Sequence, residues 1–183
     1  SLMKEMGFKC FRTSIAWTRI FPKGDENTPN EEGLKFYDNL INEIIKDGME
    51  PIITMSHYEM PIHLVTKYGG WYNRKLIDLF YRYAKVLLDR YGNRVKYWIV
   101  MNQINSFGWG ADFPGLGLAL NTHEDMLEAR YQSLHHQFVA NAMIKKYAKS
   151  LKYDIQIGVM NGCKFTYPKT CLPEDALACY QHK

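Results

Sequence analysis

Two adjacent side-chain amides, Asn102 and Gln103, follow an apolar run at residues 95–101. The run is rich in β-branched and aromatic residues, which is typical of a strand buried on both faces in a parallel sheet. In α/β proteins with parallel strands, ligands bind at the carboxyl ends of the strands, because the loops there can vary without disturbing the core. The two amides are therefore either site residues or amides that cap the loop.

A second polar cluster, His57, Tyr58 and Glu59, follows another predicted strand at residues 50–56. His57 is either a site residue or a histidine with its hydrogen bonds satisfied at a strand end. Glu59 has the residue type of a catalytic carboxylate, but its place just before Met60 and Pro61 favours a structural salt bridge. The two polar clusters would share one edge of a parallel sheet.

Residues 8–15 form a first predicted strand, which carries Arg12. From its residue type alone, Arg12 is a structural ion-pair partner. Further predicted elements alternate in type along the chain: helices at 30–48, 73–91 and 124–150, a strand at 155–160, and a helix that starts at Pro173. Asn30 and the pair Thr122 and Asp125 are predicted to cap the first and third of these helices.

Strand, loop and helix repeat at intervals of about 40 to 55 residues without a hairpin signal, so the fold class is α/β with a parallel sheet. An open doubly wound sheet and a (β/α) barrel both fit. Long polar loops after the strands favour the barrel. A complete barrel has eight strands and about 250 residues. The 183 residues with four strands therefore predict one incomplete barrel domain, 1–183, without an internal boundary, which begins in mid-fold with a helix ending at Gly7.

Composition indicates a globular protein, with 46% hydrophobic and 14% aromatic residues. The net charge of +4 is spread over several predicted helices, so we expect no nucleic-acid partner. Neither a membrane span nor a signal peptide is found, and four cysteines without a Cys-x-x-Cys pair suit reduced thiols in a cytoplasmic protein.

No cofactor and no metal site are expected. His57 and His63 lack metal-ligand spacing, and His135 and His136 lie in the middle of a helix, where packing and a backbone hydrogen bond are the expected roles. For Trp71, which follows two glycines, packing is favoured over stacking on a sugar.

Five segments, in the same order, resemble glycoside hydrolase family 1 and, within it, the bacterial 6-phospho-β-glucosidases. They are FRTSIAWTRIFP (11–22), EGLKFY (32–37), SHYEMP (56–61), YGGW (68–71) and VKYW (95–98), which leads to Asn102. The 6-phospho branch is indicated by RTSIAWT and by YEMP, where other branches tend to carry Trp-Asp-Leu-Pro. The resemblance implies a partial (β/α)8 TIM barrel that covers roughly strands 2 to 5.

The resemblance also implies hydrolysis of β-glycosides with retention of configuration, which needs two carboxyl groups roughly 5 to 5.5 Å apart. In the family, the acid/base is the Glu directly after the Asn, and here that position is Gln103. A carboxamide donates a hydrogen bond but cannot transfer a proton. The nucleophile's Glu-Asn-Gly motif is absent from the sequence, so we expect the chain to be inactive alone.

By the same resemblance, Asn102, His57 and Tyr58 would bind the sugar of a β-glucoside or 6-phospho-β-glucoside, and Arg12 would lie beside the nucleophile. Two alternatives stay open. The plant thioglucosidases of this family also carry Gln at the acid/base position, because a thioglucoside aglycone leaves without protonation. A non-catalytic half-barrel that binds sugar or self-associates through its open edges is the second alternative.

Overall fold

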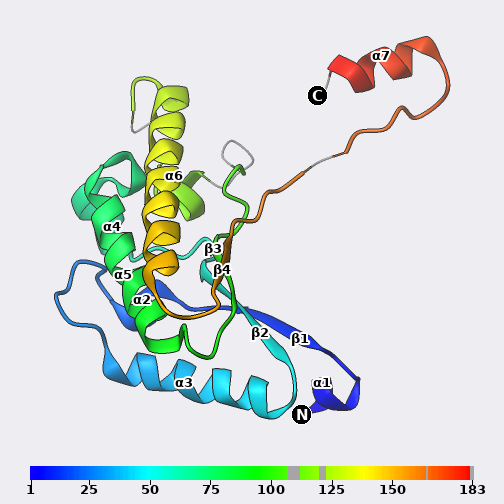
Figure 1. Cartoon of the computed structure of the whole chain (residues 1–183). Coiled ribbons are helices and arrows are strands. Elements are labelled where there is room, and N and C mark those ends of the chain that lie inside the picture. The colour runs from blue at the N-terminus through cyan, green and yellow to red at the C-terminus, as the bar shows by residue number, and fades with distance from the viewer. Residues whose placement is uncertain (107–111, 120–122, 164, 182–183) are drawn as a thin grey trace.

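The structure, a computed structural model, describes residues 1–106, 112–119, 123–163 and 165–181. Within these residues, a parallel sheet in the order β1-β2-β3-β4 is connected by helices, and α5 and α6 lie side by side (Figure 1). The elements are α1 (Leu2–Glu5), β1 (Cys10–Ser14), α2 (Trp17–Ile20), α3 (Glu31–Lys46), β2 (Glu50–Ser56), α4 (Ile62–Tyr68), η1 (Gly70–Tyr72), α5 (Lys75–Tyr91), β3 (Tyr97–Met101), η2 (Asp112–Leu116), α6 (Met126–Ser150), β4 (Gln156–Gly158) and α7 (Pro173–Gln181).

The two faces of the sheet differ in burial. Side chains on one face, including Ile53, Met55 and Trp98, are fully buried in the core. Their neighbours along the strands point to the other face, where Ile99 is half-buried and Tyr97 is 40% exposed. The prediction that β3 is buried on both faces is therefore wrong for this chain, because the described residues leave the second face partly uncovered.

Helix α3 begins where the sequence predicts. The side chain of Asn30 accepts a hydrogen bond from the backbone N–H of Glu32 at 3.2 Å, which satisfies a donor that the first helical turn leaves free. Gly33 lies in this first turn against α2, and a Cβ there would collide with the carbonyl oxygen of Arg19. The glycine therefore permits the close approach of α2 and α3.

Aromatic side chains join the helices to the sheet. Trp17 of α2 stacks on Tyr83 of α5 with ring centroids 5.4 Å apart, and Phe80 packs edge-on against Trp17 and Trp71. The Tyr83 hydroxyl lies 2.6 Å from the carbonyl oxygen of Ile15 and 2.9 Å from that of Met55. Trp71 is buried, which confirms its predicted packing role.

Several predicted boundaries are wrong by a few residues. Strand β1 begins at Cys10, and β3 begins at Tyr97 because the N–H of Val95 still bonds to the carbonyl of Tyr91 in the preceding turn. Helix α6 begins at Met126, after Asp125, whose carboxylate accepts from the N–H groups of two residues in the first turn. The predicted partner Thr122 lies outside the described residues.

The C-terminal segment lies apart from the sheet. After β4 the chain runs away from the sheet to α7, none of whose residues is buried (Figure 1).

All four cysteines are free thiols, and Cys163 and Cys171 are exposed. Among the described residues, no helix is both long and apolar enough to cross a membrane.

Substituting Tyr83→Phe tests the hydroxyl that bridges the first two strands. We expect the free energy of unfolding to fall by about 1–3 kcal/mol, because the one buried hydroxyl hydrogen that two carbonyl oxygens share is lost. Urea unfolding monitored by tryptophan fluorescence would measure it. Tyr180→Phe, at an exposed side chain of α7, is the control, and equal stability of the two variants would contradict this role.

Candidate active site

Arg12 links the four strands at their carboxyl ends. Its Nε donates to Thr54 Oγ1 at 3.1 Å, and its Nη2 donates to Asn102 Oδ1 at 2.7 Å. Its Nη1 lies 3.2 Å from the sulfur of Met160, just beyond β4. The guanidinium is thus held by hydrogen bonds, and the predicted ion-pair role is wrong: no ion pair of Arg12 is found among the described residues.

Asn102 is buried and oriented from two sides. Its backbone N–H donates to the carbonyl of Ser56 at 2.9 Å, which extends the β2–β3 pairing by one step. Its side-chain oxygen is occupied by Arg12, so the amide nitrogen is the remaining donor. An oriented donor of this kind suits a sugar hydroxyl.

His57 lies exposed at the end of β2, with its ring edge-on to Tyr58 at 5.5 Å between centroids. Partial burial and then the positive charge of Arg12 lower the pKa of His57 below its ordinary value. A neutral imidazole has one donor and one acceptor nitrogen, which matches the two hydrogen-bonding roles of a hydroxyl.

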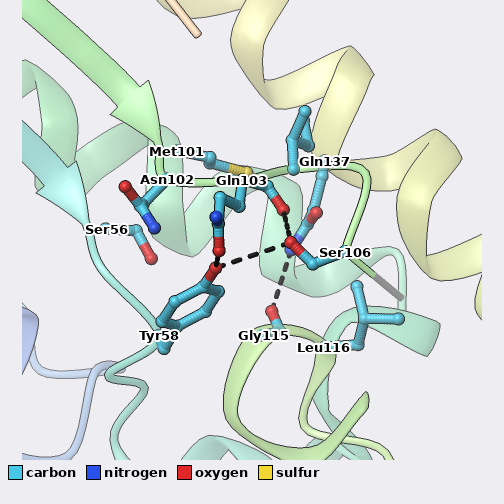
Figure 2. Close-up of a pocket in the computed structure, with 10 residues that line it drawn as sticks. Ser56, Tyr58, Met101, Asn102, Gln103, Ser106, Gly115, Leu116 and Gln137 are labelled. Carbon is cyan, nitrogen blue, oxygen red and sulfur yellow. Dashed lines mark hydrogen bonds between the residues drawn. The ribbon is translucent and has the colours of Figure 1, made fainter. Parts of the chain in front are cut away.

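Tyr58 and Gln103 meet across the ends of β2 and β3. The Tyr58 hydroxyl donates to Oε1 of Gln103, and Ser106 Oγ lies 3.5 Å from the same hydroxyl (Figure 2). Both residues have left-handed backbones, with φ of 71° for Tyr58 and 45° for Gln103. Such φ values are uncommon for residues other than glycine and cluster at functional sites.

Glu59 forms a different contact from the one predicted. Its Oε2 accepts the backbone N–H of His57 at 2.9 Å, and its buried Oε1 finds no hydrogen-bond partner among the residues that the structure describes. Burial raises the pKa of Glu59 to about 7, although the backbone of Glu59 itself and the N–H of His57 oppose this shift. The predicted salt bridge is wrong, because no cation lies within ion-pair distance of this carboxylate in the described chain.

The other histidines have structural contacts. His63 lies 3.1 Å from Asp25, whose carboxylate also accepts from Lys67 at 2.7 Å and from the Tyr68 hydroxyl at 3.0 Å. His136 is buried, with Nδ1 2.8 Å from the carbonyl oxygen of Trp71, which confirms its predicted backbone contact. The neighbouring His135 is exposed on the same helix, so its predicted packing role is wrong. Within the described residues, no group of three or more ligand side chains could hold a metal ion.

Three site residues were missed by the sequence reasoning. Thr54 lies inside a strand, where threonine is common, so the strand pattern alone did not mark it. Ser106 donates to the backbone carbonyl of Gln103 at 2.6 Å, and Gln137 of α6 donates to the carbonyl of Gly115 at 2.9 Å. Gln137 and Ser106 line one pocket with Tyr58 and Gln103 (Figure 2). A serine three residues after Gln103 can bond back to the carbonyl of Gln103 in a turn, and this spacing was the one signal that could have identified Ser106.

Parallel strands whose carboxyl ends gather polar side chains at one edge are typical of α/β enzymes, (β/α) barrels among them. The sequence model described as "Glycosyl hydrolase family 1" matches residues 1–183, and the chain belongs to this family.

Bacterial phospho-β-glucosidases are among its relatives. The chain is 52% identical over 183 residues to the aryl-phospho-β-D-glucosidase BglH of Bacillus subtilis, covering 100% of this chain and 39% of the relative. It is 46% identical to the 6-phospho-β-glucosidase AscB of Escherichia coli, covering 97% of this chain and 37% of the relative. The chain therefore spans well under half the length of these proteins.

Solved structures of family members have the same fold. A family 1 β-glucosidase from Thermotoga maritima superposes with a TM-score of 0.80 at 30% identity, over 98% of this chain and 39% of that chain. A Glu-to-Gln mutant of a rice β-glucosidase, in a covalent complex with Glc, gives 0.82 at 30% identity, over 99% and 40%. The expected partial (β/α)8 barrel is thereby confirmed.

Glu59→Gln tests the buried carboxyl. Because the pKa of Glu59 is raised from 4.5 to about 7 in the folded chain, folding favours its protonated form. Its contribution to the free energy of unfolding is present at low pH and is lost as pH rises from about 4.5 to about 7. We expect Glu59→Gln to flatten this fall, as measured by urea unfolding at pH 5 and pH 8.

The control for this comparison is Glu43→Gln, at a more exposed side chain of α3. It should keep the pH dependence of the unsubstituted chain. The same fall in stability for Glu59→Gln would show that another group titrates in this range.

Proposed function

We propose that this chain is a segment of a retaining β-glycosidase that hydrolyses 6-phospho-β-D-glucosides or the parent β-D-glucosides. The observation that carries the proposal is the pair Asn102 and Gln103 at the end of β3, in a chain matched over its whole length by the family. The bacterial relatives act, by name, on phospho-β-glucosides, which supports the phosphorylated substrate.

The proposed roles follow from the side chains at the strand ends. Asn102 and His57 hydrogen-bond sugar hydroxyls, and the ring of Tyr58 borders the same region. Arg12 is exposed, and the contact of its guanidinium with the Met160 sulfur is weaker than a contact with a carboxylate would be. The guanidinium can therefore lie beside a carboxylate nucleophile and keep that carboxylate ionised.

Gln103 occupies the place of the general acid. Its amide can hydrogen-bond the glycosidic oxygen, so a substrate with a good leaving group can still react where the nucleophile is supplied. A Glu-to-Gln mutant of a rice family member forms a covalent complex with Glc, which supports this view. Without the Glu-Asn-Gly motif, the chain alone is proposed to be inactive.

Several further expectations belong to the same proposal. The chain is one incomplete barrel domain over 1–183, acts in the cytoplasm, and needs no cofactor. Its partner is a small-molecule glucoside, and neither nucleic acid nor a membrane is a partner.

A second candidate function is a non-catalytic half-barrel that binds sugar or self-associates. The partly uncovered face of the sheet, with Tyr97 and Ile99, favours it. Apolar side chains of the last segment are also exposed, among them Phe165, Tyr167 and Tyr180. Exposed apolar surface of this kind promotes association.

Grafting tests the catalytic proposal. This chain would replace the matching segment of the Bacillus subtilis BglH, which is 52% identical and supplies the rest of the protein. We expect Gln103→Glu in the graft to raise kcat/KM for phenyl 6-phospho-β-glucoside by about 10²–10⁴-fold, because general acid catalysis is restored. The gain should be far smaller for the 2,4-dinitrophenyl substrate, because its dinitrophenolate leaving group departs without protonation.

The matched control is Gln181→Glu, which adds the same charge in α7. It should leave both rates unchanged. High activity of the graft on the phenyl substrate with Gln103 in place would contradict the assignment of this position to the general acid.

Sedimentation velocity of the isolated chain tests the second candidate. We expect dimers or larger species at micromolar concentration, because two apolar surfaces are available for contact: the partly uncovered face of the sheet and the exposed apolar side chains of the last segment. A single monomer peak together with a cooperative thermal melt would contradict self-association.

A further inference from the structure

We propose that the Tyr58 hydroxyl is a positioning group that sets which end of the residue 103 side chain faces the substrate. The inference rests on the proposed function and deepens it, because it assigns a role to a group beside the acid/base position. Tyr58 would act on the reaction through Gln103 and not by proton transfer of its own.

The direction of the hydrogen bonds identifies Tyr58 as the donor. Ser106 Oγ lies 2.6 Å from the backbone carbonyl of Gln103 and gives its one hydrogen to that oxygen. Toward Tyr58, 3.5 Å away, Ser106 can therefore act as an acceptor alone. Oε1 of Gln103 carries no hydrogen and lies closer to the Tyr58 hydroxyl than Ser106 Oγ does, so Tyr58 donates its one hydrogen to Oε1 (Figure 2).

When a side-chain amide is anchored through its oxygen, its nitrogen points away from the anchoring group. Nε2 of Gln103 has no hydrogen-bond partner among the described residues, so its two hydrogens remain available. If the amide turned over, Oε1 would face the lone pairs of a glycosidic oxygen and repel it. The Tyr58 contact therefore keeps the donor end of the carboxamide toward the leaving atom.

Both partners are held by their backbones. The Gln103 carbonyl accepts from both the N–H and the hydroxyl of Ser106, at 2.9 and 2.6 Å. On the other side, Glu59 Oε2 accepts the N–H of His57 and closes the turn in which Tyr58 has its left-handed φ. Two uncommon backbone conformations, each held in place, bring these two side chains together.

The same contact would tune a carboxyl at position 103. A phenol that donates to a carboxylate favours the ionised form and lowers the pKa. Tyr58 is the one titratable group among the described residues that line this pocket. The other titratable or charged groups nearby are Arg12, which reaches the site through Asn102, His57 beside Tyr58, and Glu59, which closes the turn of Tyr58. Helices α6 and η2 face the pocket with the uncharged Gln137 and Gly115.

Tyr58→Phe in the graft tests the proposal in two backgrounds. With Gln103, we expect kcat for the phenyl substrate to fall about tenfold and that for the 2,4-dinitrophenyl substrate to change less than about twofold, because only the first needs the amide donor. With Gln103→Glu, the basic limb of the pH profile of kcat/KM should move up by about one pH unit. Equal losses on both substrates with an unmoved pH profile would overturn the proposal.

An activity-independent measurement separates this proposal from the proposed function. In ¹⁵N spectra of the chain, the side-chain amide of Gln103 is assigned by its loss in Gln103→Glu. Tyr58→Phe should shift or broaden that signal, whereas Tyr147→Phe, which removes a hydroxyl paired with Asp89 on the helical layer, should not. An unshifted amide overturns the positioning role even if the graft is active. A shifted amide in a graft that hydrolyses no phospho-glucoside overturns the proposed function alone.

Discussion

Parallel pairing of neighbouring strands is the constraint from which the site follows. The register places Ser14 beside Thr54 and Ser56 beside Met101, so the carboxyl ends of β1, β2 and β3 lie at one edge of the sheet. Side chains from these ends then reach one another, and Arg12 joins Thr54 and Asn102 directly. Outside the sheet, the Tyr83 hydroxyl contacts the backbone just beyond β1 and within β2. The helical layer thus supports the edge on which the polar groups stand.

Under the proposed function, the geometry at position 103 is separate from its chemistry. Gln103 has a strand-end location, an anchored side-chain oxygen and an amide nitrogen without a partner in the described part of the chain, but it lacks a transferable proton. The Tyr58 hydroxyl needs an acceptor oxygen on residue 103, and the second polar atom of that side chain points away from Tyr58. A carboxyl group would meet the same requirement. We therefore expect Gln103→Glu to change proton transfer while leaving the surrounding hydrogen bonds in a form that either residue can use.

Local signals were read well from the sequence, and long-range contacts were not. The bounds of β2 and the Asn30 cap were predicted, because a short apolar run and helix capping depend on a few neighbouring residues. Glu59 was predicted to form a salt bridge from its place before Met60 and Pro61, whereas its partner is the backbone two residues away. The Tyr58 contact joins residues 45 positions apart and needs two left-handed backbones, which no local pattern in this sequence indicates. The partly exposed face of β3 depends on which other strands accompany it.

The Arg12 contacts also bear on the order in which the molecule folds. They join residues that are 42, 90 and 148 positions apart in the chain, so each one closes a longer loop than the last. Loop closure of this length costs chain entropy before any contact compensates it, which makes such contacts late events in folding. During synthesis, Arg12 would emerge from the ribosome long before Asn102 and Met160. We therefore expect the strand-end cluster to form late, after the first helices and strands have collapsed.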